Sequence, residues 1–249
     1  MGGAHSLGHR VLFAPPPWPE GGRLRLSAEE SRHAGRALRL GPGDPLTLVD
    51  GDGRRGRGVI ERWRGSRLEV RLDEAVESEA EPGPATALAL PLLRAPARTD
   101  WVVEKATELG VRALRLFAPA RGVRRAGQAS AARRRRWEEL ARAAMKQSGR
   151  CWCPRISLHA SLGEALGEPR AGERILAADP RGVGPQEWPR DARAATLLLL
   201  VVGPEGGWSP AEEALLRERE ALGVRLGPHR LRSETAAVAL CALAAARAD

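Results

Sequence analysis

Two consecutive strand–loop–helix units near the C-terminus constrain the fold of this chain more than any other feature. The first runs from Leu197 to Leu216 (LLLLVVGPEGGWSPAEEALL) and the second from Val224 to Leu240 (VRLGPHRLRSETAAVAL). In open α/β sheets, ligands bind in the loops at the carboxyl ends of the strands. The two units therefore predict one ligand pocket. The spacing of the residues alone is equally consistent with two ordinary strand-to-helix turns, such as any α/β enzyme contains.

Local signals support this interpretation of both units. Thr196 to Val202 is an unbroken apolar run, as expected of a strand that is buried on both faces. Glycines in the following loop let the backbone come close to a ligand. Ser209 and Glu212 then predict a capping box at the start of a helix. The second unit repeats this plan, with a strand from Val224 to Leu226 and Ser233 as the helix N-cap.

The charge of the chain indicates a polyanionic partner. Its 249 residues include 40 basic and 31 acidic side chains, which give a net charge of +9. Only Lys105 and Lys146 are lysines, and arginine suits the planar recognition of phosphate. Charge of this size favours nucleic acid. The alternative is a solvated surface in a sequence that is simply rich in arginine.

Other classes of protein are not supported by the sequence. It contains no apolar stretch of membrane-spanning length and no signal-peptide pattern. Cys151, Cys153 and Cys241 are odd in number and lack metal-ligand spacing, so we expect reduced thiols in a cytoplasmic protein. The five histidines are scattered, and no metal site is expected. These features predict no membrane and no metal partner.

The chain divides into two compositional halves. Short β-like runs up to residue 72 predict a small, mostly antiparallel barrel or sandwich. One helix interrupts them, which Ser27 opens with Glu30 as a capping box and which runs to about Arg39. An acidic and then Gly/Pro-rich stretch predicts a linker. Alternating strands and helices follow, which indicate an α/β domain with a mostly parallel sheet. The predicted boundaries are 1–76 for the β-rich domain, 77–84 for the linker and 85–249 for the α/β domain.

Two further patterns are less specific. Gly51, Gly53 and Gly56 match a dinucleotide-binding fingerprint, but a strand-like run follows them, so a hairpin turn is the better interpretation. Arg32, Arg36 and Arg39 recur at i, i+4 and i+7 and would share one helix face. That face could follow a phosphate backbone or could simply be solvated.

Several motifs together resemble a known family. They are VGPEGGWSPAEE, LGPHRLRSETAAVAL, HAGRALRLGPGDPLTLVDG (His33 to Gly51), EKATELGV (Glu104 to Val111) and KQSGR (Lys146 to Arg150). In order and spacing they are similar to the SPOUT class of RNA methyltransferases. More narrowly, they resemble the bacterial family that methylates N3 of a uridine in 16S rRNA of the 30S (small) ribosomal subunit. The resemblance implies a PUA-like β-barrel, followed by an α/β domain with a C-terminal trefoil knot, in a homodimer.

The resemblance also implies an S-adenosylmethionine site in the knot. One departure from the family pattern lies inside this site, where His229 and Arg230 replace an arginine followed by isoleucine or valine. Matched positions for cofactor binding are Gly203, Pro204, Glu205, Gly206, Gly207, Leu226, Gly227, Leu231, Arg232 and Thr235, with Ala178 to Pro180 in a third loop.

The candidate catalytic residues follow from the chemistry of methyl transfer to uridine. N3 is a poor nucleophile until it loses its proton, and a guanidinium can stabilise the uracil anion as charge develops on oxygen. Our hypothesis gives that role to Arg232. Glu205 or Glu234 is then the proton acceptor or holds Arg232 in place. For Glu234 the alternative is a helix N-terminal acid favoured by the dipole.

In the N-terminal domain the resemblance identifies Arg10, His33, Arg36 and Arg39 as RNA-facing. Two other functions stay open. One is a SPOUT methyltransferase acting on another RNA, such as tRNA. The other is a non-enzymatic rRNA-binding assembly factor that has lost the cofactor, although the intact pocket loops argue against this.

Overall fold

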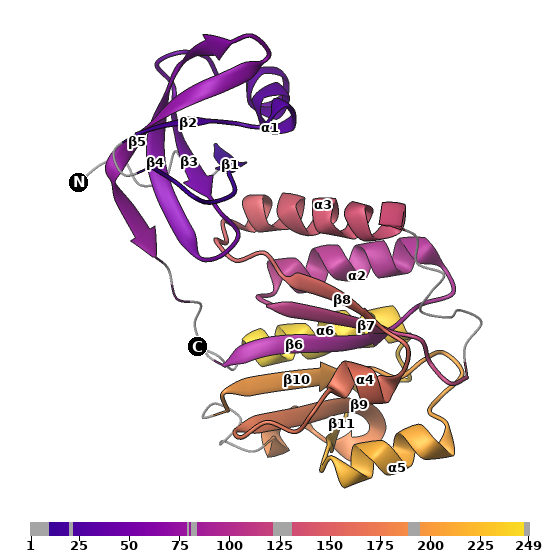
Figure 1. The fold of residues 1–249 in the computed structure, drawn as a ribbon. Coiled ribbons are helices and arrows are strands. Elements are labelled where there is room, and N and C mark those ends of the chain that lie inside the picture. Colours follow the sequence, from indigo (N-terminus) through magenta and orange to yellow (C-terminus); the bar gives the residue numbers. More distant parts are fainter. Residues whose placement is uncertain are drawn as a thin grey trace. The chain divides into compact units, whose positions relative to one another are not determined.

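The chain folds into two units in its computed structural model, which describes residues 10–19, 22–78, 80, 84–121, 131–188 and 195–246 (Figure 1). One unit comprises Met1–Glu81 with Arg142–Cys153, and the other comprises Pro82–Ala141 with Pro154–Asp249. The expected boundaries placed all of residues 85–249 together. Arg142–Cys153 instead packs with the N-terminal unit, where Met145 and Cys151 join an apolar cluster with Val11 and Val49.

A six-stranded sheet forms the centre of the C-terminal unit, in the order β11-β9-β10-β6-β7-β8. Every neighbouring pair is parallel, which confirms the predicted α/β class. The strands are β6 (Ala85–Pro91), β7 (Ala113–Phe117), β8 (Arg155–His159), β9 (Glu173–Val183), β10 (Leu197–Val201) and β11 (Leu222–Val224). The helices are α2 (Pro96–Glu108), α3 (Ala131–Ser148), α4 (Leu162–Leu166), α5 (Pro210–Glu218) and α6 (Ser233–Ala245), with a 3-10 turn η3 at Pro185–Glu187.

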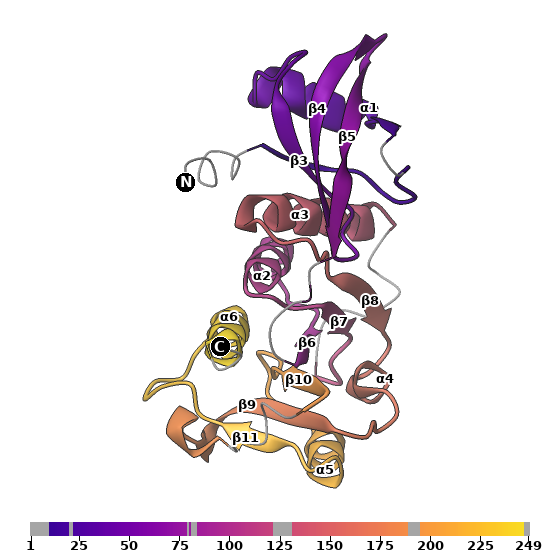
Figure 2. The same cartoon turned by 90° about the vertical axis from the view of Figure 1, so that its left-hand side faces the viewer.

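Helices cover both faces of this sheet. Helices α4 and α5 lie on one face and α2 and α6 on the other (Figure 2). In β10, Leu199 and Val201 pack into the cluster that contains α4 and α5 side chains. Leu198 and Leu200 alternate with them, so they point to the opposite face, and they too are buried. This arrangement explains why the strand reads as an unbroken apolar run.

A five-stranded sheet forms the N-terminal unit, in the order β1-β3-β4-β5-β2. Only β1 and β3 pair in parallel, so the predicted mostly antiparallel character is confirmed. Gly51 and Gly53 have positive φ in the turn between β3 and β4, as the hairpin interpretation requires. The elements are β1 (Val11–Phe13), β2 (Arg23–Arg25), α1 (Ala28–Arg32), the π-helix η1 (His33–Ala37), β3 (Pro45–Val49), β4 (Arg54–Arg64) and β5 (Arg67–Ser78).

The helix in this unit begins as predicted but ends differently. The Ser27 hydroxyl caps α1 by accepting a hydrogen bond from the Glu30 amide at 3.1 Å. The helix ends at Ala37, two residues short of the expected end near Arg39, and its last part is the π-helix η1. Arg39 lies beyond it with φ of 55°. The predicted single face of three arginines therefore does not form.

The acidic stretch expected as a linker is partly strand. Strand β5 continues to Ser78, because the long β4 supplies pairing partners for it, with Arg54 opposite Ser78 and Arg55 opposite Glu77. The predicted linker, residues 77–84, therefore begins inside a hairpin. Residues 79 and 81–83 of that linker lie outside the described residues.

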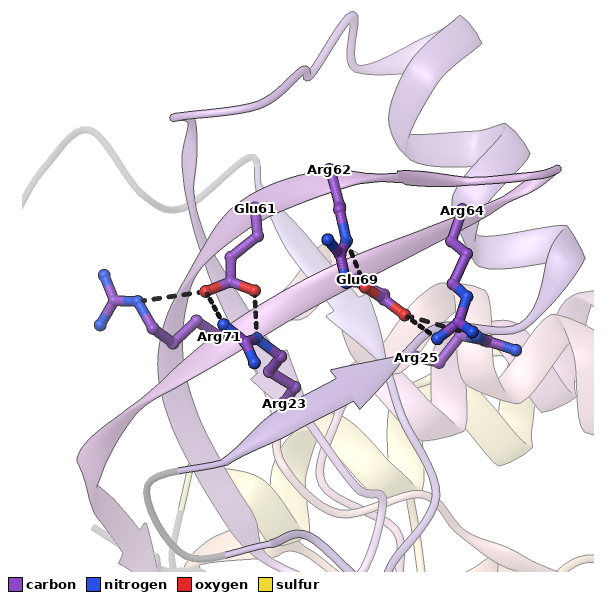
Figure 3. A network of polar contacts seen from close by, with 7 residues as sticks. All are labelled: Arg23, Arg25, Glu61, Arg62, Arg64, Glu69 and Arg71. Carbon is purple, nitrogen blue, oxygen red and sulfur yellow. Dashed lines mark hydrogen bonds and ion pairs between the residues drawn. The ribbon is translucent and has the colours of Figure 1, made fainter.

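One carboxylate on β5 organises three arginines. Glu69 accepts hydrogen bonds from Arg62 Nε at 2.7 Å and from Arg25 and Arg64 at 3.3 Å each (Figure 3). The hydrogen bond from Arg62, followed by those from Arg64 and Arg25, lowers the pKa of Glu69 to about 2, against the opposing effect of burial. The carboxylate therefore stays ionised far below neutral pH.

This network predicts a pH-dependent contribution to stability. A folded-state pKa of about 2, below the ordinary 4.5, means that ionised Glu69 stabilises the fold fully above pH 4.5. The contribution is lost as the pH falls through 2. We expect the difference in unfolding free energy between the wild type and Glu69→Gln to shrink steadily between pH 4.5 and 2. Denaturant titrations at several pH values measure it. A constant difference would contradict the prediction, and Glu138→Gln, which removes one exposed ion pair, is the control.

Candidate functional site

A cavity of about 1010 Å³ lies at the carboxyl ends of β9, β10 and β11. Because parallel strands end at the same edge of a sheet, the loops that follow β10 and β11 meet there. Residues from both loops line the cavity, together with Arg98 from the first turn of α2. The two C-terminal units of the sequence therefore contribute to one hollow, as we predicted from their order.

The loop after β10 is built around a close contact between a glycine and an indole. A Cβ at Gly203 would lie 3.1 Å from Cε2 of Trp208, so only glycine lets the backbone pass here without displacing the ring. Trp208 is in turn stacked on Phe117 of β7, with ring centroids 6.4 Å apart. The loop is therefore held against the sheet by aromatic packing.

The helix after this loop begins as the sequence predicted. The Ser209 hydroxyl accepts from the Glu212 amide at 3.2 Å, and the Glu212 carboxylate accepts from the Ser209 amide at 2.8 Å, which completes a capping box. Glu212 also accepts from the Ala120 amide at 3.1 Å. The buried carboxylate thus fixes the start of α5 to the segment that follows β7.

The second loop differs from the sequence prediction at both ends. Strand β11 ends at Val224 rather than Leu226. Ser233 is not the N-cap of α6 but its first residue, and Arg232 takes the cap position without a side-chain hydrogen bond. The Ser233 hydroxyl instead donates to the Gly203 carbonyl at 2.7 Å. The serine joins the two loops of the cavity rather than capping its own helix.

Strands β9 and β11 approach very closely beside the cavity. A Cβ at Gly182 would lie 2.3 Å from the carbonyl carbon of Gly223, so a side chain at position 182 has no room. Ala178 and Pro180 lie in the same strand, not in a loop as the resemblance implied. They line the cavity nevertheless.

Most of the residues predicted to bind a cofactor share this cavity. Gly206 and Thr235 do not line it: a Cβ at Gly206 would face the Arg121 carbonyl at 3.0 Å, and Thr235 is exposed on α6. His229 and Arg230, the departure from the family pattern, are among the lining residues. The predicted residues that do line it are Ala178, Pro180, Gly203, Pro204, Glu205, Gly207, Leu226, Gly227, Leu231 and Arg232.

Arg98 connects the two candidate carboxylates, and the sequence analysis missed it. Its Nη1 lies 3.1 Å from Glu205 Oε1, and its Nε lies 3.3 Å from Glu234 Oε1. Arg94 adds a longer contact to Glu205, at 3.5 Å. Among the described residues, neither glutamate makes an ion pair with Arg232, and both contact Arg98 instead. Arg98 lies more than 100 residues before Glu205 in the sequence, and no local motif marks it.

Glu234 is the more buried of the two glutamates. Only 8% of the residue is exposed, and it does not line the cavity. Its Oε2 atom is buried without a hydrogen-bond partner in the part of the chain that the structure describes. Glu234 also lies in the first turn of α6, where a helix dipole favours an acid. The Glu234 carboxylate therefore contacts Arg98 and lies at the amino end of the helix.

The rim of the cavity is positively charged. The side chains of Arg230 and Arg232 are exposed there. Arg181 also lines the cavity, but its Nε lies 3.3 Å from Asp179, and this hydrogen bond raises the pKa of Arg181. Among the described residues, Arg232 makes no ion pair with a carboxylate. Its guanidinium is thus available to a negatively charged group at the rim.

A second cavity, of about 650 Å³, lies in the N-terminal unit between α1, η1 and the end of α3. His33 and Arg36 line it, together with Lys146, which contacts Glu30 at 2.5 Å. Glu30 also accepts a hydrogen bond from the Phe13 amide. In the described part of the chain, the Glu30 carboxylate makes no capping-box hydrogen bond to the backbone at the start of α1. The π-helix η1 directs His33 and Arg36 to the same hollow.

The other two residues predicted to face RNA lie elsewhere. Arg10 pairs with Asp44 at 3.2 Å, and Arg39 follows the end of η1. Neither lines this cavity. The structure therefore brings together only His33 and Arg36 of the four.

Three further observations concern the described residues only. No helix in them is long and apolar enough to cross a membrane. No group of three or more His, Cys, Asp or Glu side chains is placed to hold a metal ion. Cys151, Cys153 and Cys241 form no disulfide with one another, and burial raises the pKa of Cys241 to about 12.

Comparison with known proteins accounts for both units. Residues 81–245 match the RNA methyltransferase domain, and residues 26–73 match the RNA methyltransferase PUA domain. The chain is 34% identical to ribosomal RNA small subunit methyltransferase E of Mycobacterium tuberculosis, over 91% of this chain and 88% of that protein. The chain belongs to the ribosomal RNA small subunit methyltransferase E family. The Bacillus subtilis member is 27% identical over 85% of each chain.

Solved structures of similar proteins extend this result. A methyltransferase from Legionella pneumophila, in complex with S-adenosylmethionine, matches with a TM-score of 0.83 and 27% identity, covering 95% of this chain and 97% of that one. Methyltransferase E from Neisseria gonorrhoeae, also bound to S-adenosylmethionine, matches with a TM-score of 0.81 and 26% identity, covering 94% and 95%. The fold of this family member thus corresponds to theirs over both units.

The bridge made by Arg98 predicts a stability effect. Arg98→Met leaves the buried Glu234 without its cation, so we expect a loss of about 1–2 kcal/mol in unfolding free energy. Arg94→Met is the matched control, since it removes only a 3.5 Å contact from a side chain that is 68% exposed. Adding Glu234→Gln to Arg98→Met should recover part of the loss. Equal stability of Arg98→Met and Arg94→Met in denaturant titrations would refute the bridge.

Proposed function

We propose that this protein transfers a methyl group from S-adenosylmethionine to N3 of a uridine in 16S rRNA of the small ribosomal subunit. The observation that carries the proposal is the cavity formed by the two C-terminal loops, in a chain of the methyltransferase E family. Two structures similar to this chain hold S-adenosylmethionine. The name of the family supports small-subunit rRNA as the substrate.

The lining of the cavity fits this cofactor. A volume of about 1010 Å³ accommodates a ligand of its size. Val202, Leu226 and Leu231 offer apolar contacts to the faces of adenine, while the backbone at Gly227 has open space where a side chain would block the adenine edge. When bound, S-adenosylmethionine supplies a methyl group carried on a sulfonium.

The residues of the chain then act on the uridine. Alignment of the nucleophile with the methyl group supplies much of the acceleration in an in-line displacement. Glu205 lines the cavity and Glu234 does not, so we assign the acceptance of the N3 proton to Glu205. Arg232, exposed at the rim, stabilises the negative charge that develops on the uracil oxygens. Arg98 positions Glu205.

The proposal includes the knot and the homodimer that the family resemblance implies. In support of the knot, the chain leaves β11 at the edge of the sheet and returns to its centre, where α6 packs on α2, β6, β9 and β10. In support of a dimer, Trp101 on α2 is 42% exposed, which leaves a large apolar side chain for a second copy to cover. Action on the ribosome also places the protein in the cytoplasm.

Two other functions remain distinguishable by experiment. A SPOUT enzyme acting on tRNA would methylate tRNA and not the small subunit, and an assembly factor without a cofactor would show no heat of binding with S-adenosylmethionine. We therefore propose incubating small subunits, naked 16S rRNA and tRNA with the protein and labelled cofactor, followed by mass-spectrometric mapping. Methylation at uridine N3 in 16S rRNA alone is the expected result. Labelled tRNA alone, or no label, would overturn the proposal.

The role of Arg232 can be tested directly. We expect Arg232→Ala to lower turnover by about 100-fold, because the developing charge on uracil loses the guanidinium that stabilises it in this proposal. Calorimetry with S-adenosylmethionine separates this effect from loss of cofactor. Arg217→Ala, on α5 and outside the cavity, is the control and should leave turnover unchanged. Near-normal turnover of Arg232→Ala with undiminished cofactor binding would exclude the assignment.

The RNA-facing role of the N-terminal unit predicts a change in salt dependence. Arg36→Gln should reduce the slope of log K against log salt by about 1 in filter binding to 16S rRNA, since each lost phosphate contact releases fewer counterions. If Arg39 also contacts phosphate, Arg36→Gln/Arg39→Gln should reduce it by about 2. If the slope is the same for wild type and Arg36→Gln, Arg36 does not contact phosphate and only belongs to a solvated surface.

A further inference from the structure

A second basic face in the N-terminal unit takes no part in either cavity. Strands β2, β4 and β5 contribute five arginines and two glutamates to one side of the sheet (Figure 3). The residues of this arginine face are Arg23, Arg25, Glu61, Arg62, Arg64, Glu69 and Arg71.

The arginines of this face carry more positive charge and more N–H donors than the two carboxylates can neutralise or bind. Three of them share Glu69, and two share Glu61, with Arg23 at 2.6 Å and Arg71 at 3.8 Å. Each guanidinium has five N–H donors and uses at most two of them in hydrogen bonds to these glutamates. The arginine side chains are 43–67% exposed, so the remaining donors and a net charge of +3 face solvent.

This face lies on the opposite side of the sheet from the His33 cavity. In β5, Leu68, Val70 and Leu72 are buried in the core, and the Leu68 amide donates a hydrogen bond to the Ser31 hydroxyl of α1. Because side chains alternate along a strand, Glu69 and Arg71 point away from α1. One RNA element in contact with His33 and Arg36 would therefore not reach the arginine face without wrapping around the sheet.

The arginine face also lacks an aromatic side chain among the described residues. Trp63, the exposed tryptophan of β4, lies between Arg62 and Arg64 in sequence but points to the other side. A Cβ on Gly35 of η1 would be 2.9 Å from Trp63 Cζ2, so the indole lies against the helix. Proteins that bind single strands stack bases on aromatic rings. The arginine face offers phosphate contacts alone.

We propose that the arginine face binds the phosphate backbone of double-stranded RNA, at a site separate from the one that receives the target uridine. Guanidinium groups fixed by Glu61 and Glu69 present their donors in defined directions, which suits bidentate binding of phosphate. Phosphate contacts of this kind set position and carry no sequence information. The proposal rests on the proposed function only in taking RNA as the substrate of the enzyme.

The test compares two double variants of the full-length protein, Arg62→Gln/Arg64→Gln and Arg23→Gln/Arg71→Gln. The probes are two RNA duplexes of unrelated sequence and a single-stranded RNA of equal length, in filter binding across a salt series. Each double variant should lower the slope of log K against log salt for both duplexes by about 2 and leave single-strand binding unchanged. Arg134→Gln/Arg217→Gln, in the other unit, removes the same charge and is the control.

An unchanged duplex slope in both variants would overturn the proposal. So would an equal reduction in the control, which would indicate bulk charge, or a greater loss for the single strand. If polyglutamate displaces the wild-type protein from a bound duplex as effectively as competing duplex does, the face binds an acidic protein instead. If Arg62→Gln/Arg64→Gln fails to fold, Arg23→Gln/Arg71→Gln decides, since it leaves Glu69 paired. Methylation of small subunits by the wild type is measured in parallel, so loss of the proposed enzyme function is recognised separately.

Discussion

One guanidinium, that of Arg98, holds together the parts of the candidate site. It contacts Glu205 in the loop after β10 and Glu234 at the start of α6, and it belongs to α2. The hydrogen bond from Ser233 to Gly203 joins the same two loops through the backbone. These two links connect the loops above the edge of the sheet. A loop that must hold a ligand in one geometry has to lose its conformational freedom before the ligand arrives.

Local features of the site were predictable from the sequence, and long-range ones were not. The capping box of Ser209 and Glu212 lies within four residues and forms as predicted. Glu30 offers the same pattern behind Ser27, yet its carboxylate bonds to Lys146, 116 residues away. The backbone donor of a capping box competes for the carboxylate with every other donor that the fold brings near. The spacing of residues in the sequence does not reveal those other donors.

The segment Arg142–Cys153 shows the same limit at the level of domains. Its helical pattern continues from residues that belong to the C-terminal unit, so nothing local separates it. Its backbone nevertheless contacts the N-terminal unit: the Gly149 carbonyl accepts a hydrogen bond from Arg55 at 2.5 Å, and the Cys153 amide donates to the Gly51 carbonyl at 2.8 Å. Hydrophobic periodicity predicts that a helix has a buried face but not which residues will cover it.

The distribution of arginine and lysine follows the geometry that each contact requires. Arg98 reaches two carboxylates on different elements from two of its nitrogens, which the planar fork of a guanidinium holds in fixed directions. Lys146 meets one carboxylate, Glu30, at a site where both side chains are largely buried and a compact charge fits. On the arginine face, the fork lets one side of each guanidinium bind glutamate while the other side remains open. An arginine-rich composition thus serves both functions, because the same group that fixes a carboxylate retains donors for phosphate.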